Sequence, residues 1–457
     1  VTKLLPSRVG ALFMEMGTGK SRTAIELARI RRDKIDRVVW FCPVSTKETI
    51  RHEILKHTGA ANDDICVFDH RTRDNAIPAA RWYVIGIESM SSSNRVVLAV
   101  RELIDHRTMV IVDESSYIKG HRAKRTERIT ILAEPARYRL VLTGTPISQG
   151  VQDLFSQMKF LSPKILGYHS WYTFARNHLE YSDRYRGLIV RAHNTAWLAE
   201  KIRPYVYQVT KDECLDLPDK LFESRWCSLS AEQQRAYTVA KDRFVSDMME
   251  YHDDSKWESS MPIFRLFSSL QGVACGFYKN EDGSPVLLSH RRRDLLEDTL
   301  RRIPDNEKVV VWAKYHHCIR EIVAALPADQ VCQYHGHLSE RQRHAELQRW
   351  RESGRVLVAT QAAGGHGLDL TAANHVIFYA NGFKYSERIQ AEDRCHRIGQ
   401  SKPVTYIDLW AECGIEGRIQ SALWRKGNTV QEFKDEVDKI KDKHNRKALL
   451  QKLVKKL

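Results

Sequence analysis

The sequence has 457 residues, 42% of them hydrophobic and 28% charged, the balance of an ordinary soluble globular protein of about two to four domains. Its formal net charge of +15 at pH 7 favours a polyanionic partner such as nucleic acid, with a merely basic surface as the alternative. No apolar run approaches the ~18–20 residues that cross a membrane, no secretory signal pattern opens the chain, and the nine cysteines form no CxxC pair. These features exclude a membrane-spanning protein and argue against a zinc site or a disulfide framework.

Residues 1–160 are predicted to form a first α/β domain. Short apolar runs rich in β-branched residues alternate with helical patterns such as "KSRTAIELARIRR". Such runs are typical of buried parallel strands, and the helices between them give βαβ units. The expected strands are "RVVWFC" from residue 37, "WYVIGI" from 82, "TMVIVD" from 108 and "YRLVLTG" from 138.

The stretch "MEMGTGKS", residues 14–21, follows a predicted strand and precedes a predicted helix, which is the context of a phosphate-binding loop. Its glycines let backbone N–H groups converge on phosphate, Lys20 can reach the β- and γ-phosphates of ATP, and Ser21 can hold Mg²⁺. The strict pattern GxxxxGK(S/T) would have Gly at Met14, so a chance glycine turn is the alternative. The residues predicted to bind nucleotide here are Gly17, Thr18, Gly19, Lys20 and Ser21.

An acidic pair follows the predicted strand at 108–113. In "VIVDESS", Asp113 is expected to bind the Mg²⁺ shell, and Glu114 is expected to orient and deprotonate the attacking water. An exposed acidic turn is the alternative. After the next strand, "LTGTP" places Thr143 and Thr145 where they can hydrogen-bond to the acidic pair or to a second domain. Three such elements in this order indicate an ATPase site.

Three further segments complete the predicted organisation. Residues 161–300 are predicted to be a helical insertion and linker without a strand series, in which Ser230 caps the clearest helix. Residues 301–427 are predicted to be a second α/β domain with the strands "KVVVWA", "VCQYHG", "RVLVAT", "HVIFYA" and "VTYIDLW". Residues 428–457 are predicted to form a basic amphipathic helix that packs on this domain, with a free DNA-binding tail as the alternative.

The second α/β domain contains two segments with candidate functional residues. In "QAEDRCHRIGQ", residues 390–400, Gln390, Arg394 and Arg397 recur at helical spacing and are predicted to share one face of one helix. Two arginines in a cleft are suited to stabilising charge on a transferring phosphoryl group, and a solvated basic helix is the alternative. The adjacent histidines of "YHHC", from residue 315, point apart on a helix and have no second ligand pair for a metal.

Taken together, these motifs resemble the Swi/Snf-type ATPases of helicase superfamily 2. "MEMGTGKS", "FCPVSTKETIRHEI", "DESS" and "LTGTP" are similar to the family's successive motifs in the first domain, and "IRPYVYQVTKDECLDLPDK" and "LSAEQQRAY" fit the segments that follow. "GGHGLDLTAAN" resembles the fifth motif and "QAEDRCHRIGQ" the sixth, whose ending Arg-Ile-Gly-Gln is the most diagnostic. Three positions depart from the usual residue: Ile50 stands where Trp is usual, Ser116 where His is, and Asp369 where Asn is common.

The resemblance implies an α/β fold of two RecA-like lobes with parallel sheets, binding ATP and Mg²⁺ in the cleft between them. It implies an ATPase driven by double-stranded DNA that moves along the duplex. It makes Arg394 and Arg397 catalytic together with Lys20 and the acidic pair, and adds Gly365 and Gln390 to the nucleotide-binding residues. No adenine-reading residue is assigned, because the family's glutamine is absent from "VTKLLPSRVG" ahead of the loop.

Two other functions are kept as alternatives. One is a strand-separating DNA or RNA helicase of the same superfamily. The other is a non-catalytic DNA-binding or docking module, against which the presence of Lys20, the acidic pair and both arginines argues. Because no chromatin-reading segment or long disordered tail accompanies the two domains, we expect a compact bacterial or phage protein, DNA-associated in the cytoplasm, with a nuclear protein as the alternative.

Overall fold

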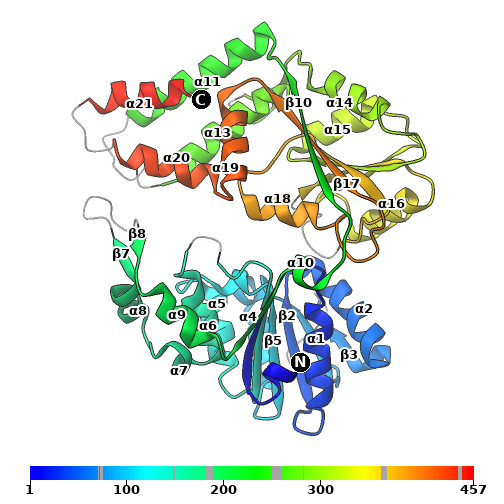
Figure 1. Ribbon diagram of the computed structural model, residues 1–457, viewed down its shortest axis with the longest axis vertical. Helices are drawn as coiled ribbons and strands as arrows, with labels where there is room; N and C mark the ends of the chain where they lie inside the picture. Colours follow the sequence, from blue (N-terminus) through cyan, green and yellow to red (C-terminus); the bar gives the residue numbers. More distant parts are fainter. Residues whose placement is uncertain are drawn as a thin grey trace. The chain divides into compact units, whose positions relative to one another are not determined.

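A computed structural model describes residues 1–69, 72, 76–147, 150–181, 189–249, 257, 259–280, 282–361, 368–440 and 445–457. The chain divides into two compact units, Val1–Asp216 and Leu217–Leu457. Each unit contains one large parallel sheet with helices on its faces (Figure 1). The two parallel sheets confirm the predicted α/β class.

The first unit has a seven-stranded sheet in the order β3-β4-β2-β5-β6-β1-β9. All of its strand pairs are parallel, and each strand predicted from the sequence is present. The strands are β1 (Val9–Met14), β2 (Arg37–Cys42), β3 (Ile65–Val67), β4 (Trp82–Gly86), β5 (Thr108–Asp113), β6 (Tyr138–Thr143) and β9 (Val206–Val209).

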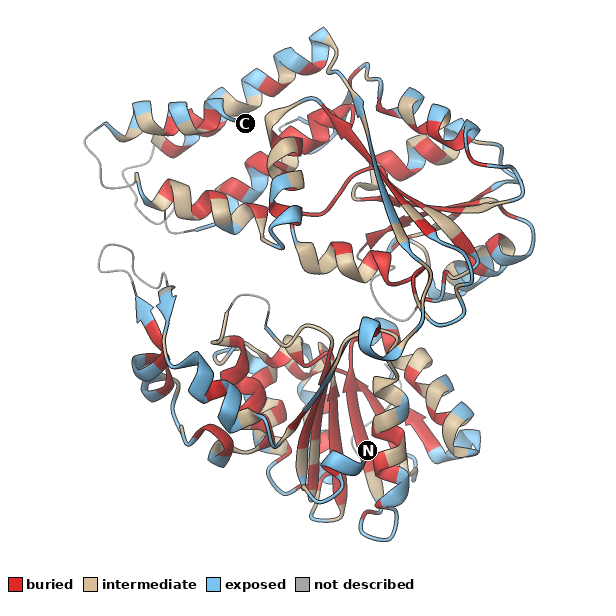
Figure 2. Cartoon of the chain, in the orientation of Figure 1, coloured by how far each residue is buried: buried red, intermediate tan, exposed pale blue. Residues whose placement is uncertain are grey.

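Alternate residues of these strands enter two cores, one on each face of the sheet. Val39 and Phe41 of β2 pack in one core, and Val38 and Trp40 pack in the other. Both faces are therefore covered, which is why the strands are nearly continuous apolar runs (Figure 2). The helices of this unit are α1 (Lys20–Ile30), α2 (Lys47–Thr58), α3 (Ser89–Ser92), α4 (Asn94–Leu103), α5 (Lys124–Leu132), α6 (Asp153–Leu161), α7 (Pro163–Leu166), α8 (Trp171–His178), α9 (Thr195–Ile202) and α10 (Lys211–Cys214), with short 3₁₀ turns at Thr2–Leu4, Val44–Thr46, Asn62–Asp64 and Ser115–Ile118.

The second unit has a six-stranded sheet in the order β10-β17-β16-β13-β15-β14, again with parallel pairs throughout. The five strands β13 to β17 are those predicted from the sequence, and β10 is an additional strand at one edge of the sheet. The strands are β10 (Lys220–Cys227), β13 (Lys308–Ala313), β14 (Val331–Tyr334), β15 (Val356–Thr360), β16 (Ala373–Phe378) and β17 (Val404–Ala411). The helices include α11 (Ala231–Met249), α13 (Met261–Ala274), α14 (Arg292–Arg301), α15 (His316–Ala325), α16 (Glu340–Glu352), α18 (Tyr385–Glu392) and α19 (Gly414–Trp424).

The predicted strand-free insertion at 161–300 is wrong in two respects. The segment is divided between the two units at Asp216 and Leu217, and it supplies β9 to the first sheet and β10 to the second. It also contains two antiparallel hairpins, β7 (Leu179–Tyr181) with β8 (Ile189–Ala192) and β11 (Phe277–Lys279) with β12 (Pro285–Leu287). The edge strands escaped prediction because they are largely exposed and lack the apolar run of a central strand.

The C-terminal residues pack on the second unit, as favoured from the sequence, but as two helices rather than one. They are α20 (Thr429–Asp438) and α21 (Arg446–Lys455). Phe433, Val437, Leu450 and Val454 are buried in a core shared with α11 and α13, and the four helices lie together (Figure 1). Among the described residues, none of the helices combines the length and apolar character that crossing a bilayer requires.

Candidate nucleotide-binding site

The loop predicted to hold phosphate connects β1 to α1 in the first unit. Gly17 and Gly19 adopt φ values of 82° and 93°, a left-handed conformation that glycine takes without Cβ strain. Gly19 is the N-cap of α1, and the helix begins at Lys20. The first N–H groups of a helix have no partner within it and carry partial positive charge, so the loop presents donors suited to an anion.

The side chain of Lys20 folds back over this loop. Its Nζ donates to the backbone oxygens of Met14 at 2.8 Å and Glu15 at 3.1 Å. Thr18 Oγ1 donates to the same Glu15 oxygen at 2.7 Å, and Ser21 lies in the first turn of α1. The ammonium group of Lys20 is therefore held beside the glycine turn. The five residues predicted to bind nucleotide all lie in this turn and the first turn of α1.

The acidic pair lies where β5 ends. Asp113 is the last residue of the strand, and its Oδ1 accepts the backbone N–H of Glu114 at 2.9 Å. Burial and the neighbouring Glu114 raise the pKa of Asp113 to about 7, while the charge of Lys20 acts in the opposite direction. Glu114 adopts φ 49°, a left-handed conformation that costs free energy for a residue other than glycine. The loop and the acidic pair both follow strands of the same parallel sheet.

Strand order explains why these motifs meet. The loop follows β1, the acidic pair follows β5, and "LTGTP" follows β6, which lies between them in the sheet. Parallel strands present their carboxyl ends at one edge, the usual place for a ligand in α/β folds. Thr143 Oγ1 donates to Glu114 Oε2 at 3.4 Å, and Thr145 N donates to Thr143 Oγ1 at 3.1 Å. The expected link from Thr143 to the acidic pair is present.

Gln157 in α6 is a supporting residue that the sequence reasoning missed. Its side chain is fully buried and accepts a hydrogen bond from Ser115 Oγ at 2.6 Å. Its amide nitrogen donates to the backbone oxygen of Pro146 at 2.8 Å. Gln157 thus connects the segment after β5 with the segment after β6. The only signal was a glutamine within the otherwise apolar pattern "DLFSQMKFL".

In the second unit the predicted helix face is wrong. Gln390 lies in α18, but that helix ends at Glu392, so Arg394 and Arg397 follow it in turns. Tertiary hydrogen bonds end the helix: the Arg394 oxygen accepts the N–H of Leu370 at 3.0 Å. Spacing alone could not reveal these bonds, because their partners lie more than 20 residues earlier in the chain.

Arg394 and Arg397 differ in how far they are buried. Arg394 is buried, with 4% of its surface exposed, whereas Arg397 is half-buried and its Nη1 donates to the Leu368 oxygen at 3.3 Å. Gln400 helps to hold this segment by donating to the oxygens of Thr371 and Ala373. Gly365 lies outside the described residues.

Arg388 in α18 is a second residue that the sequence reasoning missed. It is buried, with 6% of its surface exposed, and forms ion pairs with Glu392 at 2.8 Å and Asp408 at 2.5 Å. It also donates to Asn381 Oδ1 at 3.0 Å. These bonds fix α18 to β17 and to the loop after β16, so Arg388 positions the segment that carries Gln390.

The site in the first unit fits a nucleotide with a divalent cation. Its donor set contains backbone N–H groups and an ammonium for phosphate, and the Ser21 hydroxyl and Asp113 carboxylate for Mg²⁺, which prefers oxygen ligands. The described residues contain no group of three or more His, Cys, Asp or Glu side chains arranged to hold a metal by themselves.

Comparison with known proteins identifies two family matches along the chain. The SNF2-related domain family matches residues 6–276 and the helicase conserved C-terminal domain matches residues 291–399. ATP-dependent DNA helicase DDM1 of Arabidopsis thaliana is 24% identical over 449 residues, with 91% of this chain and 58% of that protein covered. DNA annealing helicase and endonuclease ZRANB3 of Mus musculus is 25% identical over 479 residues, with 98% and 43% covered.

The chain therefore spans about half the length of these two curated relatives. Among solved structures, the SWI2/SNF2 ATPase core of Sulfolobus solfataricus in complex with dsDNA shares 22% identity, covers 97% of this chain and 92% of that one, and has a TM-score of 0.41. The match to the SNF2-related domain extends over more than half of the 457 residues and includes the loop, the acidic pair and "LTGTP". The chain belongs to the SNF2-related family of ATP-dependent helicase-like proteins.

Proposed function

We propose that this chain is a DNA-dependent ATPase that couples ATP hydrolysis to movement along double-stranded DNA. The observation that carries the proposal is the meeting of the loop, the acidic pair and Thr143 at the ends of three adjacent strands, in a chain of the SNF2-related family. The names of the two relatives, a DNA helicase and a DNA annealing helicase, support DNA as the activating ligand.

In this proposal each residue of the first unit has one task. Gly17 to Ser21 hold the phosphates, with Lys20 on the β- and γ-phosphates and Ser21 and Asp113 holding Mg²⁺. Mg²⁺ held by these two residues would offset charge on the transferring phosphoryl group. Glu114 accepts the proton of the attacking water, and the hydroxyl of Thr143 orients its carboxylate.

The second unit contributes Arg397, with Arg394 assisting, and Gln390 and Gly365 contact the nucleotide. In this proposal Arg397, whose Nη1 here donates to the Leu368 oxygen, reaches the γ-phosphate when the two units close on ATP. DNA that contacts both units favours closure, so DNA binding accelerates hydrolysis by a shift in population.

The basic composition supports a phosphate-backbone interaction that does not depend on base sequence. A net charge of +15 supplies many Lys and Arg contacts, and each phosphate contact releases counterions, so affinity falls steeply with salt. In this proposal the protein acts on DNA in the cytoplasm of a bacterial cell, as a bacterial or a phage protein. A nuclear location is the alternative.

Steady-state ATPase rates with no nucleic acid, single-stranded DNA, duplex DNA and RNA test the proposal. Duplex DNA should stimulate most, and stimulation should decline as salt rises. Equal or greater stimulation by RNA contradicts it. Release of a strand from a tailed duplex would instead identify a strand-separating helicase, and DNA binding without any turnover would identify a docking module.

A further inference from the structure

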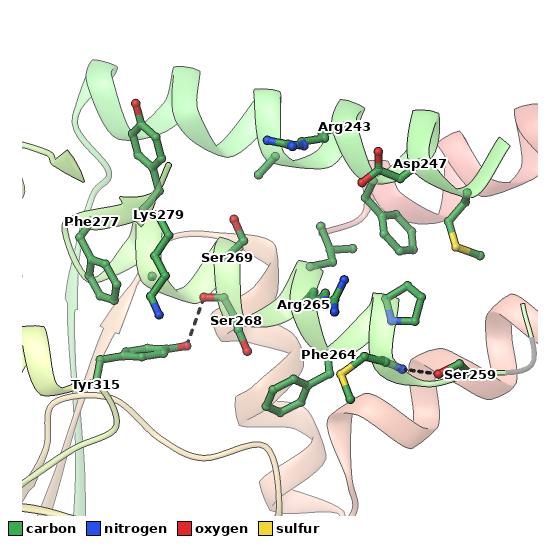
Figure 3. A pocket seen from close by; sticks show the side chains of 18 of the residues that line it. Arg243, Asp247, Ser259, Phe264, Arg265, Ser268, Ser269, Phe277, Lys279 and Tyr315 are labelled. Carbon is green, nitrogen blue, oxygen red and sulfur yellow. Dashed lines mark hydrogen bonds between the residues drawn. The ribbon is translucent and has the colours of Figure 1, made fainter. Parts of the chain in front are cut away.

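The second unit contains a hollow of about 950 Å³ away from the motifs described above. It lies along α11 and α13 and is bounded at one end by β11 and by the turn after β13 (Figure 3). On α13 the described lining runs from Met261 to Gly272. At ~1.5 Å per residue this is about 17 Å, or about three helical turns. The hollow is thus elongated along two helices.

The floor of this groove is apolar and its outer part is open to solvent. Phe244 and Met248 of α11 and Leu266 of α13 are buried and line it. Met261 and Phe264 also line it, yet 54% and 45% of their surfaces are exposed. Large exposed apolar side chains beside a hollow are typical of surfaces that bind a partner.

Basic side chains border the apolar floor on three elements. They are Arg243 on α11, Arg265 on α13 and Lys279 on β11, all of them exposed, and Asp247 is the one acidic residue among the described lining (Figure 3). A ligand with several carboxylates is complementary in charge to these three basic side chains. Opposite charges around an apolar centre supply orientation and selectivity in addition to the burial of apolar surface.

The end of the groove beside Lys314 and Tyr315 is held by internal hydrogen bonds. Tyr315 OH donates to Ser268 O at 3.2 Å (Figure 3). Lys314 Nζ and Tyr315 OH both donate to Gln271 Oε1, at 2.8 Å and 3.1 Å. These bonds fix the end wall to α13. A preformed wall lowers the ordering cost that a ligand has to offset on binding.

We propose that this groove docks an acidic amphipathic helix of a partner protein, with its apolar side chains on the floor and its carboxylates beside Arg243, Arg265 and Lys279. A channel about three turns long between two helices matches helix-in-groove recognition, in which anchors recur at every third or fourth position. DNA is a poorer occupant, because its charged and hydrated backbone has no apolar projection to fill a floor of Phe, Met and Leu side chains.

Binding of a designed peptide to the full chain tests the proposal. The probe is a fluorescein-labelled helix of about 16 residues with Leu or Phe at every third or fourth position and Glu elsewhere on the groove-facing side. One control peptide has Lys in place of Glu, and another has Ser in place of the apolar anchors. Fluorescence anisotropy should show the acidic, anchored probe binding at least about tenfold more tightly than both controls.

Variants of the chain locate the binding. The double substitution Arg265→Glu with Lys279→Glu should weaken the probe about tenfold or more. Arg235→Glu, an exposed position on α11 outside the groove lining, should leave probe binding unchanged. All three positions are exposed, so melting temperatures should stay close to that of the unmodified chain.

Three results overturn the proposal: equal affinity for the probe and its controls, equal effects of the groove and Arg235 variants, or displacement of the probe by duplex DNA. DNA-stimulated ATPase activity of the groove variants should be retained. A loss of that activity together with probe binding would make the groove part of the DNA site instead. The direct titrations of probe, control peptides and variants are independent of the ATPase proposal, since they need neither ATP nor DNA.

Discussion

The two units use charged side chains in opposite ways. In the first, Lys20 and Asp113 lie at the carboxyl ends of β1 and β5, on either side of β6, and Lys20 lies beside a glycine turn. In the second, Arg292 and Glu416 form an ion pair at 2.8 Å with at most 1% of either side chain exposed. The comparison teaches that position relative to the strand ends, rather than residue type, decides whether a charge serves a ligand or holds the fold. Substitutions should therefore damage turnover in the first case and stability in the second.

The largest expected effect is that of Arg397→Ala, because Arg397 is the side chain of the second unit that is proposed to stabilise charge on the γ-phosphate held by the first unit. DNA-stimulated turnover should fall by ~10³ or more, as for other arginine fingers. ATP and DNA binding should survive, since the contact forms mainly in the transition state. Arg397→Lys should rescue poorly, because an ammonium cannot reproduce the planar fork. Turnover and equilibrium binding measured on the same preparations check this.

Arg351→Ala is the matched control for Arg397. Arg351 Nη2 donates to the Asp369 oxygen at 3.0 Å, much as Arg397 donates to the neighbouring Leu368 oxygen, but it has no proposed catalytic task. If both variants lose stability and the folded fraction of each keeps its stimulated rate, Arg397 only supports the segment and the finger is refuted.

Next in size is the contrast between Glu114→Gln and Lys20→Ala. Glu114→Gln removes the base, so turnover should fall about 10²–10⁴-fold while ATP still binds. Lys20→Ala removes a phosphate contact, so binding and turnover should fall together. Pre-steady-state turnover and a nucleotide-binding titration separate the two, with the exposed Glu134→Gln as control. Near-normal turnover of Glu114→Gln would show that another group accepts the proton.

The loop and the acidic pair could be predicted from the sequence because each is local. A glycine turn between a strand and a helix, and two carboxylates at a strand end, need only neighbours in the chain. Parallel sheets were equally predictable, since strands covered on both faces are apolar throughout. Gln157 was not predictable, because its partners Ser115 and Pro146 come from other elements.

The end of α18 shows the same limit in the second unit. "QAEDRCHRIGQ" has no Gly or Pro before Gly399 and was expected to continue as a helix. The helix stops at Glu392, and the backbone at Arg394 hydrogen-bonds to Leu370. β10 was missed for a related reason: its stability as a strand comes from pairing along all of β17 and not from its own pattern. Tertiary pairing therefore decided both cases.

A third prediction concerns the buried ion pair of the second unit. Glu416→Gln leaves the guanidinium of Arg292 buried without its counter-charge, although Arg292 still donates to the oxygens of Tyr379 and Leu409. Loss of one partner of a buried pair costs about 3–5 kcal/mol. Urea denaturation should show a loss of this order. Asp298→Asn, which breaks an exposed pair with Arg301, should cost about 1 kcal/mol or less. Equal losses of unfolding free energy in the two variants would show that burial does not make the Arg292–Glu416 pair more important for stability than the exposed pair.

The smallest expected effect is a pH dependence caused by Lys314. Burial lowers the pKa of this lysine to about 7, while Cys275, Glu387 and Glu416 act in the opposite direction. Its pKa in the unfolded chain is about 10.4. Between these two values the unfolded chain binds a proton that the folded chain has released. The free energy of unfolding should therefore rise with pH across this window, by at most about 1.4 kcal/mol per pH unit, and this pH dependence is absent below pH 7, where both states hold the proton.

Lys314→Met isolates this contribution, because methionine retains apolar contact with Phe383, over whose ring the ammonium now lies. At pH 7 the variant should be at least as stable as the unmodified chain, since a charge that is costly to bury is gone. Towards pH 9 its advantage should shrink, because the unmodified chain then holds Lys314 neutral. Urea denaturation at pH 7, 8 and 9, with the exposed Lys447→Met as control, measures the difference in slope. Parallel pH profiles for the unmodified chain and Lys314→Met would show that the lysine keeps its charge, and that the second unit accommodates it as an ion as it does Arg292.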